Sequence, residues 1–287
     1  MKYKLPDISL TESQLRFVGG RQRYATTTAV KSIDENKIVT AQYMGKKIFL
    51  IDISNGFNII SEIRTNYYPD LMDYYNDKIV CTNFPSMGDK NGGVSIFRIE
   101  ENKIKHEKDI VLPDIKSHGC RFIDDNNLII TSTGDNTRGL LLMDITTEKY
   151  EVFDNFQFYP KDVSLVDDKL FVVTSKSRPN ITKGVQVEDS ILYVFNYPSM
   201  VKIDEMRFFE QTDAISFSNG YGFITLQTSD ELLMFSFIDN KLKHVTNIPG
   251  YNFPHGVDYY NHRVIVTNYG DNTIQINNIN ELINFEI

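Results

Sequence analysis

The stretch FPHGVDYYNHRVIVTNYGDNTIQI, residues 253–276, contains an alternating segment, a polar turn, a β-branched run, a second turn and another alternating segment. An earlier stretch, PDLMDYYNDKIVCTNF at residues 69–84, repeats its Pro, its Asp-Tyr-Tyr-Asn and its Thr-Asn-aromatic ending. Alternation with a period of two is typical of half-buried strands, and Asn or Asp clusters between such segments mark tight turns. The chain is therefore built from repeats of short β-strands.

Six copies of this pattern can be aligned on the residue before each β-branched run, namely Lys37, Lys78, Asn127, Lys169, Gly222 and Arg263. Their spacings are 41, 49, 42, 53 and 41 residues. Periods of about 40 to 50 residues with several short strands are typical of propeller blades. The sequence predicts an all-β fold, a six-bladed β-propeller of four-stranded antiparallel blades.

We expect a single domain with copies at 23–66, 67–114, 115–157, 158–209, 210–250 and 251–287. Residues 1–10 resemble the fourth strand of the second copy and are predicted to clasp the last blade, with the tail 281–287 as the competitor for that edge. Seven blades are the alternative. They would need residues 1–22 and the C-terminal tail to form another complete sheet, and these segments contain few strand signals.

Composition excludes several classes of protein. The 287 residues have a net charge of −8 and no long cluster of Lys and Arg, which argues against nucleic-acid binding. No segment approaches the length of a membrane helix and the N-terminus lacks a signal-peptide pattern, so a cytoplasmic protein is expected. The two cysteines, Cys81 and Cys120, are interpreted as buried reduced thiols.

The segment GVDYYNHRVIVTNYGDNTIQI, residues 256–276, resembles the YVTN-type repeat of lactonase-like β-propellers, and TSTGDNTRGLLLMD, residues 131–144, is a weaker copy. The resemblance implies the propeller architecture. Its members include lactone hydrolases and binding proteins, so it does not name a function. The chain has no Trp, and therefore lacks the aromatic-Trp pattern of metal-dependent gluconolactonases. No catalytic residue is carried over from the family.

In a propeller, the innermost strands surround a central channel, and their entrances meet at one mouth. The predicted entrance residues are Ala29, Asp70, His118, Lys161, Asp213 and His255. At three entrances an aromatic residue directly precedes a Pro, and this arrangement would bring Tyr68, Tyr159 and Phe253 to the mouth. Gly119 and Gly256 follow the two histidines, where they would permit close approach to a ligand or a tight turn.

Three residues further into the channel, every copy has a polar residue: Ser32, Asp73, Arg121, Ser164, Ser216 or Asp258. Arg121 is expected to face Asp73 and Asp258. Buried charges need partners, so this group is interpreted either as a structural charge network or as part of a ligand site.

One functional hypothesis is an enzyme that acts on a small anionic or sugar-like molecule, by lactone hydrolysis or elimination. His118 and His255 would supply acid and base near neutral pH. An imidazole would be oriented by Asp70, Asp162 or Asp213, and developing negative charge would be stabilised by Lys161 or Arg23. The candidate ligand-binding residues are Arg23, Tyr68, Lys161, Tyr159, Phe253 and Arg121. The same histidines and carboxylates would alternatively hold a divalent metal ion as cofactor.

The other hypothesis is a non-catalytic module whose mouth or loop face binds a protein or a glycan. The 16 Tyr and 19 Phe include candidates for sugar stacking and for interface anchors. Long loops at 84–93 and 174–189 lie on the mouth side of the second and fourth copies, where such loops are often functional. Dependence of binding on the two histidines, or on these loops, distinguishes the hypotheses.

Overall fold

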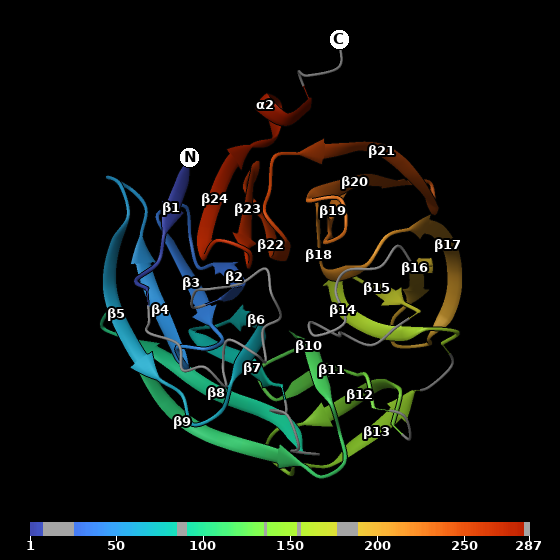
Figure 1. Cartoon of the computed structure of the whole chain (residues 1–287). Helices are drawn as coiled ribbons and strands as arrows, with labels where there is room; N and C mark the ends of the chain where they lie inside the picture. Colours follow the sequence, from blue (N-terminus) through green and yellow to red (C-terminus); the bar gives the residue numbers. More distant parts are fainter. Residues whose placement is uncertain (8–25, 85–90, 135–136, 154–155, 177–188, 284–287) are drawn as a thin grey trace.

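Six four-stranded antiparallel sheets stand around a central axis in the computed structural model of the chain (Figure 1). The structure describes residues 1–7, 26–84, 91–134, 137–153, 156–176 and 189–283. The predicted six-bladed β-propeller is therefore confirmed. In each of the first five blades, four strands consecutive in sequence run from the channel to the rim.

Strand bounds in the first three blades are as follows. Blade one contains β2 (Thr27–Ser32), β3 (Lys37–Gln42), β4 (Lys47–Asp52) and β5 (Asn58–Arg64). Blade two contains β6 (Pro69–Tyr75), β7 (Lys78–Asn83), β8 (Gly92–Glu100) and β9 (Lys103–Leu112). Blade three contains β10 (Ser117–Phe122), β11 (Asn127–Ser132), β12 (Gly139–Asp144) and β13 (Tyr150–Phe153).

The other three blades follow the same order. Blade four contains β14 (Tyr159–Val166), β15 (Lys169–Ser175), β16 (Asp189–Asn196) and β17 (Val201–Phe209). Blade five contains β18 (Thr212–Ser218), β19 (Tyr221–Leu226), β20 (Glu231–Ile238) and β21 (Lys241–Pro249). Blade six contains β22 (Pro254–Tyr260), β23 (Arg263–Asn268), β24 (Thr273–Asn278) and the N-terminal β1 (Lys2–Lys4).

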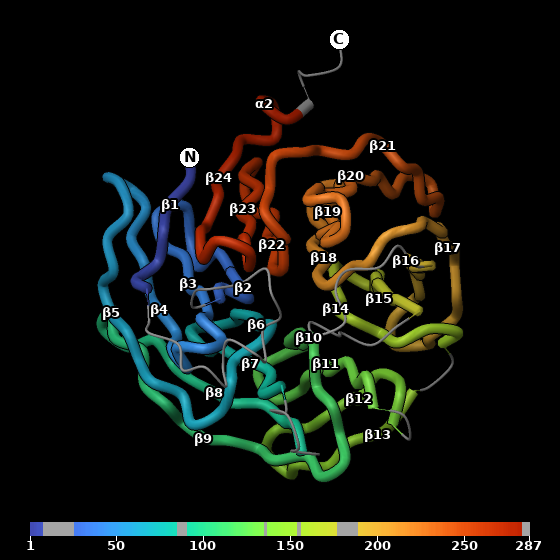
Figure 2. The backbone as a smooth tube through the Cα atoms, in the orientation of Figure 1, coloured from blue at the N-terminus to red at the C-terminus, as the bar shows by residue number. Residues whose placement is uncertain are grey.

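The ring is closed by strands from both ends of the chain. β1 runs antiparallel to β24, with Tyr3 opposite Ile274, so an N-terminal strand forms the rim of the last blade (Figure 2). The charged N-terminus of Met1 donates to the Ile276 carbonyl at 2.7 Å. The end of the sixth copy instead forms a short helix, α2 (Ile279–Ile283). Pairing of β1 covers a sheet edge that would otherwise be open.

Tight turns join the first and second strands of each blade, at the end of the channel opposite the mouth. Both residues of the Asn76-Asp77 and Asn261-His262 turns have positive φ, between 45° and 62°. Asn and Asp adopt this left-handed conformation more readily than most residues. The Asn and Asp residues between the strands of the repeat therefore form the tight turns that the sequence predicted.

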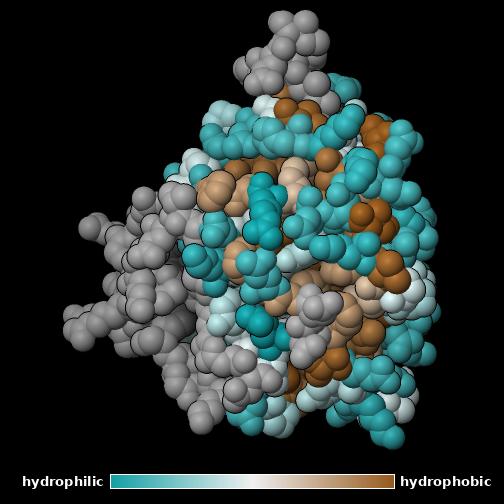
Figure 3. Space-filling model, turned by 90° about the vertical axis from the view of Figure 1, so that its right-hand side faces the viewer, coloured by the Kyte–Doolittle hydropathy of each residue, from teal (hydrophilic) through white to brown (hydrophobic). Residues whose placement is uncertain are grey.

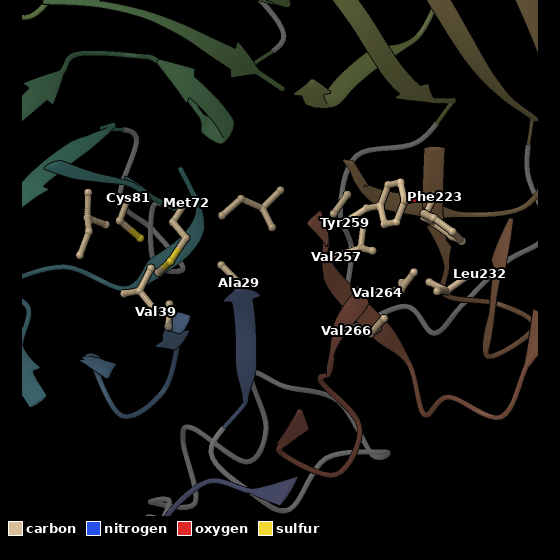
Figure 4. Packing of buried hydrophobic residues seen from close by; sticks show 14 of the residues in the cluster. Ala29, Val39, Met72, Cys81, Phe223, Leu232, Val257, Tyr259, Val264 and Val266 are labelled. Carbon is tan, nitrogen blue, oxygen red and sulfur yellow. The ribbon is translucent and has the colours of Figure 1, made fainter. Parts of the chain in front are cut away.

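The core lies between adjacent blades, where apolar side chains of neighbouring sheets interdigitate. In Figure 4, Val39 of blade one lies beside Met72 and Cys81 of blade two, within one buried cluster. Both cysteines are free and buried, in agreement with their interpretation as apolar core residues. The inner strands of a blade thus pack against the neighbouring blades on both faces.

The outer surface is mixed. On the side shown in Figure 3, hydrophobic residues lie in separate patches among hydrophilic ones. Phe209, at the end of β17, is the most exposed of the large aromatic side chains described, at 70%. Within the described part of the chain, no helix has the length and apolar character needed to cross a membrane.

Candidate functional site

All six innermost strands have a β-bulge or a similar irregularity at the entrance to the channel. The ladder to the second strand shifts register there, for example between Ser117 and Cys120 and between Pro254 and Val257. A bulge bends a strand and re-aims the side chains at the shift. The residues at the six shifts are Thr28, Asp70, His118, Lys161, Asp213 and His255.

Five of these six residues are the predicted entrance residues, and the first blade needs a correction. The bulge in β2 falls between Thr27 and Ala29, so Thr28 and not Ala29 occupies the equivalent position. Ala29 packs in the apolar cluster between blades. The first copy therefore does have a polar residue at the entrance. Successive side chains of a strand point to opposite faces, so an alignment shifted by one residue replaced Thr28 with Ala29.

The two imidazoles, from opposite blades three and six, stack across the channel mouth. The ring centroids of His118 and His255 are 6.2 Å apart and the ring planes differ by 25°. Each Nδ1 bonds a carbonyl of the next blade: His118 that of Lys161 at 2.9 Å, and His255 that of Thr28 at 3.0 Å. A carbonyl can only accept, so each Nδ1 carries a hydrogen and each Nε2 faces the channel.

Two carboxylates bridge the imidazoles. Asp213 lies 3.2 Å from Nε2 of His118 and 3.0 Å from Nε2 of His255. Asp70 lies at 3.7 and 3.6 Å from the same two atoms. We call these four residues the His–Asp quartet; all are at least nine-tenths buried.

Charge interactions in the quartet outweigh the effect of burial on the imidazoles. Burial lowers their pKa values, but Asp70 and Asp213 raise the pKa of His118, and Asp213 and Asp70 raise that of His255 to about 9. A pKa of about 9 keeps His255 an imidazolium at neutral pH, with both nitrogens donating, and the pKa of His118 is shifted in the same direction.

The two carboxylates of the quartet differ. Burial raises the pKa of Asp70, against the opposing effect of the two histidines. Burial also acts on Asp213, but His255 and His118 hold its pKa well below the usual range. Asp213 is the firmly ionised member of the pair, and Asp70 is the one that accepts a proton more readily.

Deeper in the channel lies a second charged layer. Arg121 donates to Asp73 at 2.7 Å, as predicted, and its charge also acts on Asp258, although the ion pair of Asp258 is formed with Lys31 at 3.2 Å. Lys31 was not anticipated, because the sequence alignment placed Ser32 at this level. The guanidinium of Arg121 also donates to the Val163 carbonyl of the next blade.

Polar residues of this layer tie each inner strand to the next. The backbone N–H groups of the following blade donate to Asp73, Asp162, Ser164, Ser216 and Asp258. Asp162 accepts from Ile215 at 3.1 Å, and burial raises its pKa to about 6 against Arg121 and Lys31. It is not among the described residues that line the mouth cavity.

The glycines after the histidines have a structural explanation. A Cβ on Gly119 would lie 2.7 Å from the Lys161 carbonyl oxygen, and one on Gly256 would lie 2.5 Å from that of Thr28. These are the carbonyls that receive the imidazole hydrogen bonds. The backbone at these glycines therefore approaches the neighbouring blade closely. This contact explains the glycines without a ligand.

A small cavity of about 30 Å³ opens above the quartet. Its described lining consists of Thr28, Tyr43, Asp70, Phe84, His118, Gln211, Asp213, Gln227, Phe253, His255 and Tyr269. Tyr269 stacks on His255 with centroids 5.2 Å apart, and Phe84 meets His118 edge-on at 6.0 Å. A volume of this size holds one or two water molecules or one small polar group.

The remaining predicted site residues lie around this cavity or outside the described chain. Phe253 lines it, whereas Tyr68 stacks on Tyr43 and Tyr159 receives Arg138 over its ring. Lys161 is completely buried, and its charge acts on Asp70 and His118. Arg23 and the loop segments 85–90 and 177–188 fall outside the described residues.

Sequence reasoning missed the aromatic and amide lining and the role of a recurrent threonine. Tyr43, Phe84 and Tyr269 directly follow the second strands of their blades. The sequence pattern at these positions indicated the repeat but not a role in the site. Thr267 in β23 accepts from Gly256 N at 2.7 Å and donates to the Thr28 carbonyl at 3.1 Å. Threonines in the same place brace four of the other five bulges, and the repeated Thr of the motif indicated them: Thr40, Thr82, Thr131 and Thr225. Thr174 of blade four instead donates to the Ile191 carbonyl.

The quartet was also predicted to suit a divalent metal ion. Among residues with described positions, no group of three or more His, Cys, Asp and Glu side chains is arranged to hold one. Each Nε2 faces carboxylate oxygens of both aspartates at 3.0 to 3.7 Å, which is the geometry of paired charges.

No family model and no curated protein sequence matches the chain. Among solved structures, the chain is similar to a protein of unknown function from Bacteroides thetaiotaomicron, with 8% identity, a TM-score of 0.62, and 94% of this chain and 71% of the other covered. It is also similar to virginiamycin B lyase from Staphylococcus aureus, with 12% identity, a TM-score of 0.56, and 96% and 98% covered.

The β-propeller domain of Cps50 (Swd1) from Myceliophteria thermophila is a third similar structure, with 14% identity, a TM-score of 0.54, and 90% and 85% covered. At these identities the similarities establish the propeller fold. They include a protein named as a lyase and a protein of unknown function, and a fold of this kind carries many functions.

Proposed function

We propose that the mouth of the channel is an active site that performs acid–base chemistry on a small oxygenated molecule, of the lyase or lactone hydrolase type. One observation carries the proposal: two imidazoles of raised pKa and two carboxylates of unequal pKa converge at the floor of one cavity. Pairs of titratable groups whose environments separate their pKa values are typical of acid–base sites. The fold similarity to virginiamycin B lyase and the YVTN-type resemblance are compatible with this class.

The proposed roles follow from the pKa directions. Asp70 acts as the base, because burial raises its pKa. His255 acts as the acid through Nε2–H, and His118 supports the developing negative charge. Asp213 remains ionised and holds both imidazoles in place.

Either reaction balances with these groups. In an elimination, Asp70 takes a proton from the carbon beside a carbonyl, the C–H electron pair forms a double bond, and the leaving oxygen departs with a proton from His255. In lactone hydrolysis, Asp70 takes a proton from water as the water oxygen bonds to the carbonyl carbon. The ring C–O bond then breaks with its electron pair on the ring oxygen, which His255 protonates. General acid–base groups contribute about 10²- to 10⁴-fold each.

The test is a turnover screen with purified protein against lactones and against esters or ethers that have an acidic proton beside a carbonyl. Turnover that falls at least 100-fold in His255→Gln and Asp70→Asn, but not in the exposed His244→Gln control, supports the proposal. Circular dichroism establishes that each variant is folded. Turnover that persists in folded quartet variants contradicts the proposal.

A second candidate is a non-catalytic binding module, favoured by the saturation of the quartet: each Nε2 already faces two carboxylates. In that case the quartet would be a structural plug, and a protein or glycan would bind around it. Ligand binding that survives His255→Gln, with no turnover in any variant, distinguishes this candidate.

A further inference from the structure

We infer that the mouth cavity selects a neutral, hydroxyl-bearing group and discriminates against carboxylates and phosphates. This inference concerns the ligand of the site proposed above, and rests on that proposal only for the location of the site. The sequence left anionic and sugar-like ligands as alternatives. Three independent features of the described residues decide between them.

The first feature is the charge balance of the channel. The inner strands bring together five basic side chains, Lys31, His118, Arg121, Lys161 and His255, and five carboxylates, Asp70, Asp73, Asp162, Asp213 and Asp258. Even with both imidazoles protonated, the basic groups do not outnumber the carboxylates. The described channel therefore offers an incoming anion no excess of positive charge, and desolvating an anion there would be costly.

The second feature is a chain of two glutamines with a fixed polarity. Gln227 donates through Nε2 to Asp213 at 2.6 Å, and Gln211 donates through Nε2 to Oε1 of Gln227 at 3.0 Å. A carboxylate only accepts, so it sets the orientation of both amides. None of the residues that the structure describes donates to the Oε1 of Gln211 at the end of this chain, so this oxygen is placed to accept from a ligand donor.

An acceptor in this position distinguishes ligand groups. A hydroxyl donates to the Gln211 Oε1, whereas a carboxylate or phosphate oxygen would be repelled by it. Both glutamines line the cavity, beside the quartet. A site built to bind a hydroxyl therefore penalises a ligand that cannot donate, because its own buried polar group is left unpaired.

The third feature is the size and lining of the cavity. About 30 Å³ accommodates a hydroxyl or hydroxymethyl group, and not a whole ring. Aromatic walls formed by Tyr43, Phe84, Phe253 and Tyr269 surround it. We therefore expect one hydroxylated end of a larger molecule to enter, while its carbon face packs on aromatic rings, as neutral sugars and polyols do.

The experiment measures binding by calorimetry and thermal shift for matched probes: glucose with glucuronate, galactose with galacturonate, and inositol with inositol phosphate. The neutral member of a pair should bind, and the anionic member should bind at least tenfold more weakly. Gln211→Met should weaken neutral binding about tenfold, the effect of one lost hydrogen bond of about 1.4 kcal/mol. The exposed Gln157→Met is the matched control and should bind as the wild type does.

Tighter binding of the anions, unchanged neutral binding in folded Gln211→Met, or no binding by any neutral probe would each overturn the inference. These outcomes are separate from failure of the proposed reaction. Turnover of an anionic substrate that depends on His255 keeps the reaction and overturns the ligand class. Neutral binding that depends on Gln211, without turnover, keeps the ligand class and overturns the reaction.

Discussion

His118 and His255 stack across the channel mouth with ring centroids 6.2 Å apart, although they belong to blades three and six on opposite sides of the ring. Positive charge on two imidazoles this close is unfavourable unless carboxylates lie between them. Asp70 and Asp213 supply that compensation, from blades two and five. The quartet thus links four blades in one electrostatic unit, and we expect the effects of substitutions within it to be non-additive.

The stability of the protein should fall as the pH rises above neutrality. The pKa of His255 is raised from 6.5 to about 9, so its contribution is fully present below pH 6.5 and is lost as the pH rises through 9. The difference corresponds to about 3 kcal/mol, at about 1.4 kcal/mol per pH unit. Thermal melts between pH 6 and 10 should show a decline that His255→Gln flattens. The same decline in His255→Gln and wild type would contradict the assignment, and His244→Gln should melt as the wild type does.

The two quartet aspartates should differ in their effect on the imidazoles. Asp213 is nearer to both Nε2 atoms than Asp70 is, at 3.0 and 3.2 Å against 3.6 and 3.7 Å. Asp213→Asn should therefore lower the pKa of His255 more than Asp70→Asn does. Titration of the histidine ring resonances by NMR measures both. Equal shifts, or a larger shift in Asp70→Asn, would show that the distances do not control the coupling.

The threonine brace at the ring closure should be important for stability. Thr267→Val keeps the shape of the side chain but leaves the buried Gly256 N–H and one contact of the Thr28 carbonyl without their partner. An unsatisfied buried group costs about 1 to 3 kcal/mol. Urea unfolding should show this loss, and Thr267→Ser, which restores the hydroxyl, should recover most of it. A Val variant as stable as wild type would mean that the bulge does not need the brace.

The fold was predictable because its signals are local and repeated. Alternation, β-branched runs and Asn-rich turns recur six times, and each reports the backbone of its own segment. Once the repeat indicates a propeller, the topology brings residues as distant as Asp70 and His255 to one mouth. That step explains how the sequence could place Asp70, His118, Asp213 and His255 at one entrance, although no recognised motif joins them.

The details of the site were less predictable, because they depend on contacts between blades. The one-residue error at Ala29 came from a bulge, which the sequence does not mark. The pairing of Lys31 with Asp258 depends on how the inner strands are staggered. The glutamine chain joins Gln211, just before β18, to Gln227, just after β19, and nothing in the sequence of either segment indicates it.

Ring closure by β1 should depend on Leu5, which is 2% exposed and packs with Val30, Ile265 and Ile274 where the first and last blades meet. Leu5→Ala removes buried methyl groups and should lower the free energy of unfolding by about 2 to 5 kcal/mol. Lys2→Ala is the control from the same segment: its ion pair with Asp271 is solvent-exposed, and such pairs contribute little. Chemical denaturation of both variants measures the difference. If the two variants unfold at the same denaturant concentration as the wild type, the N-terminal strand does not hold the ring closed.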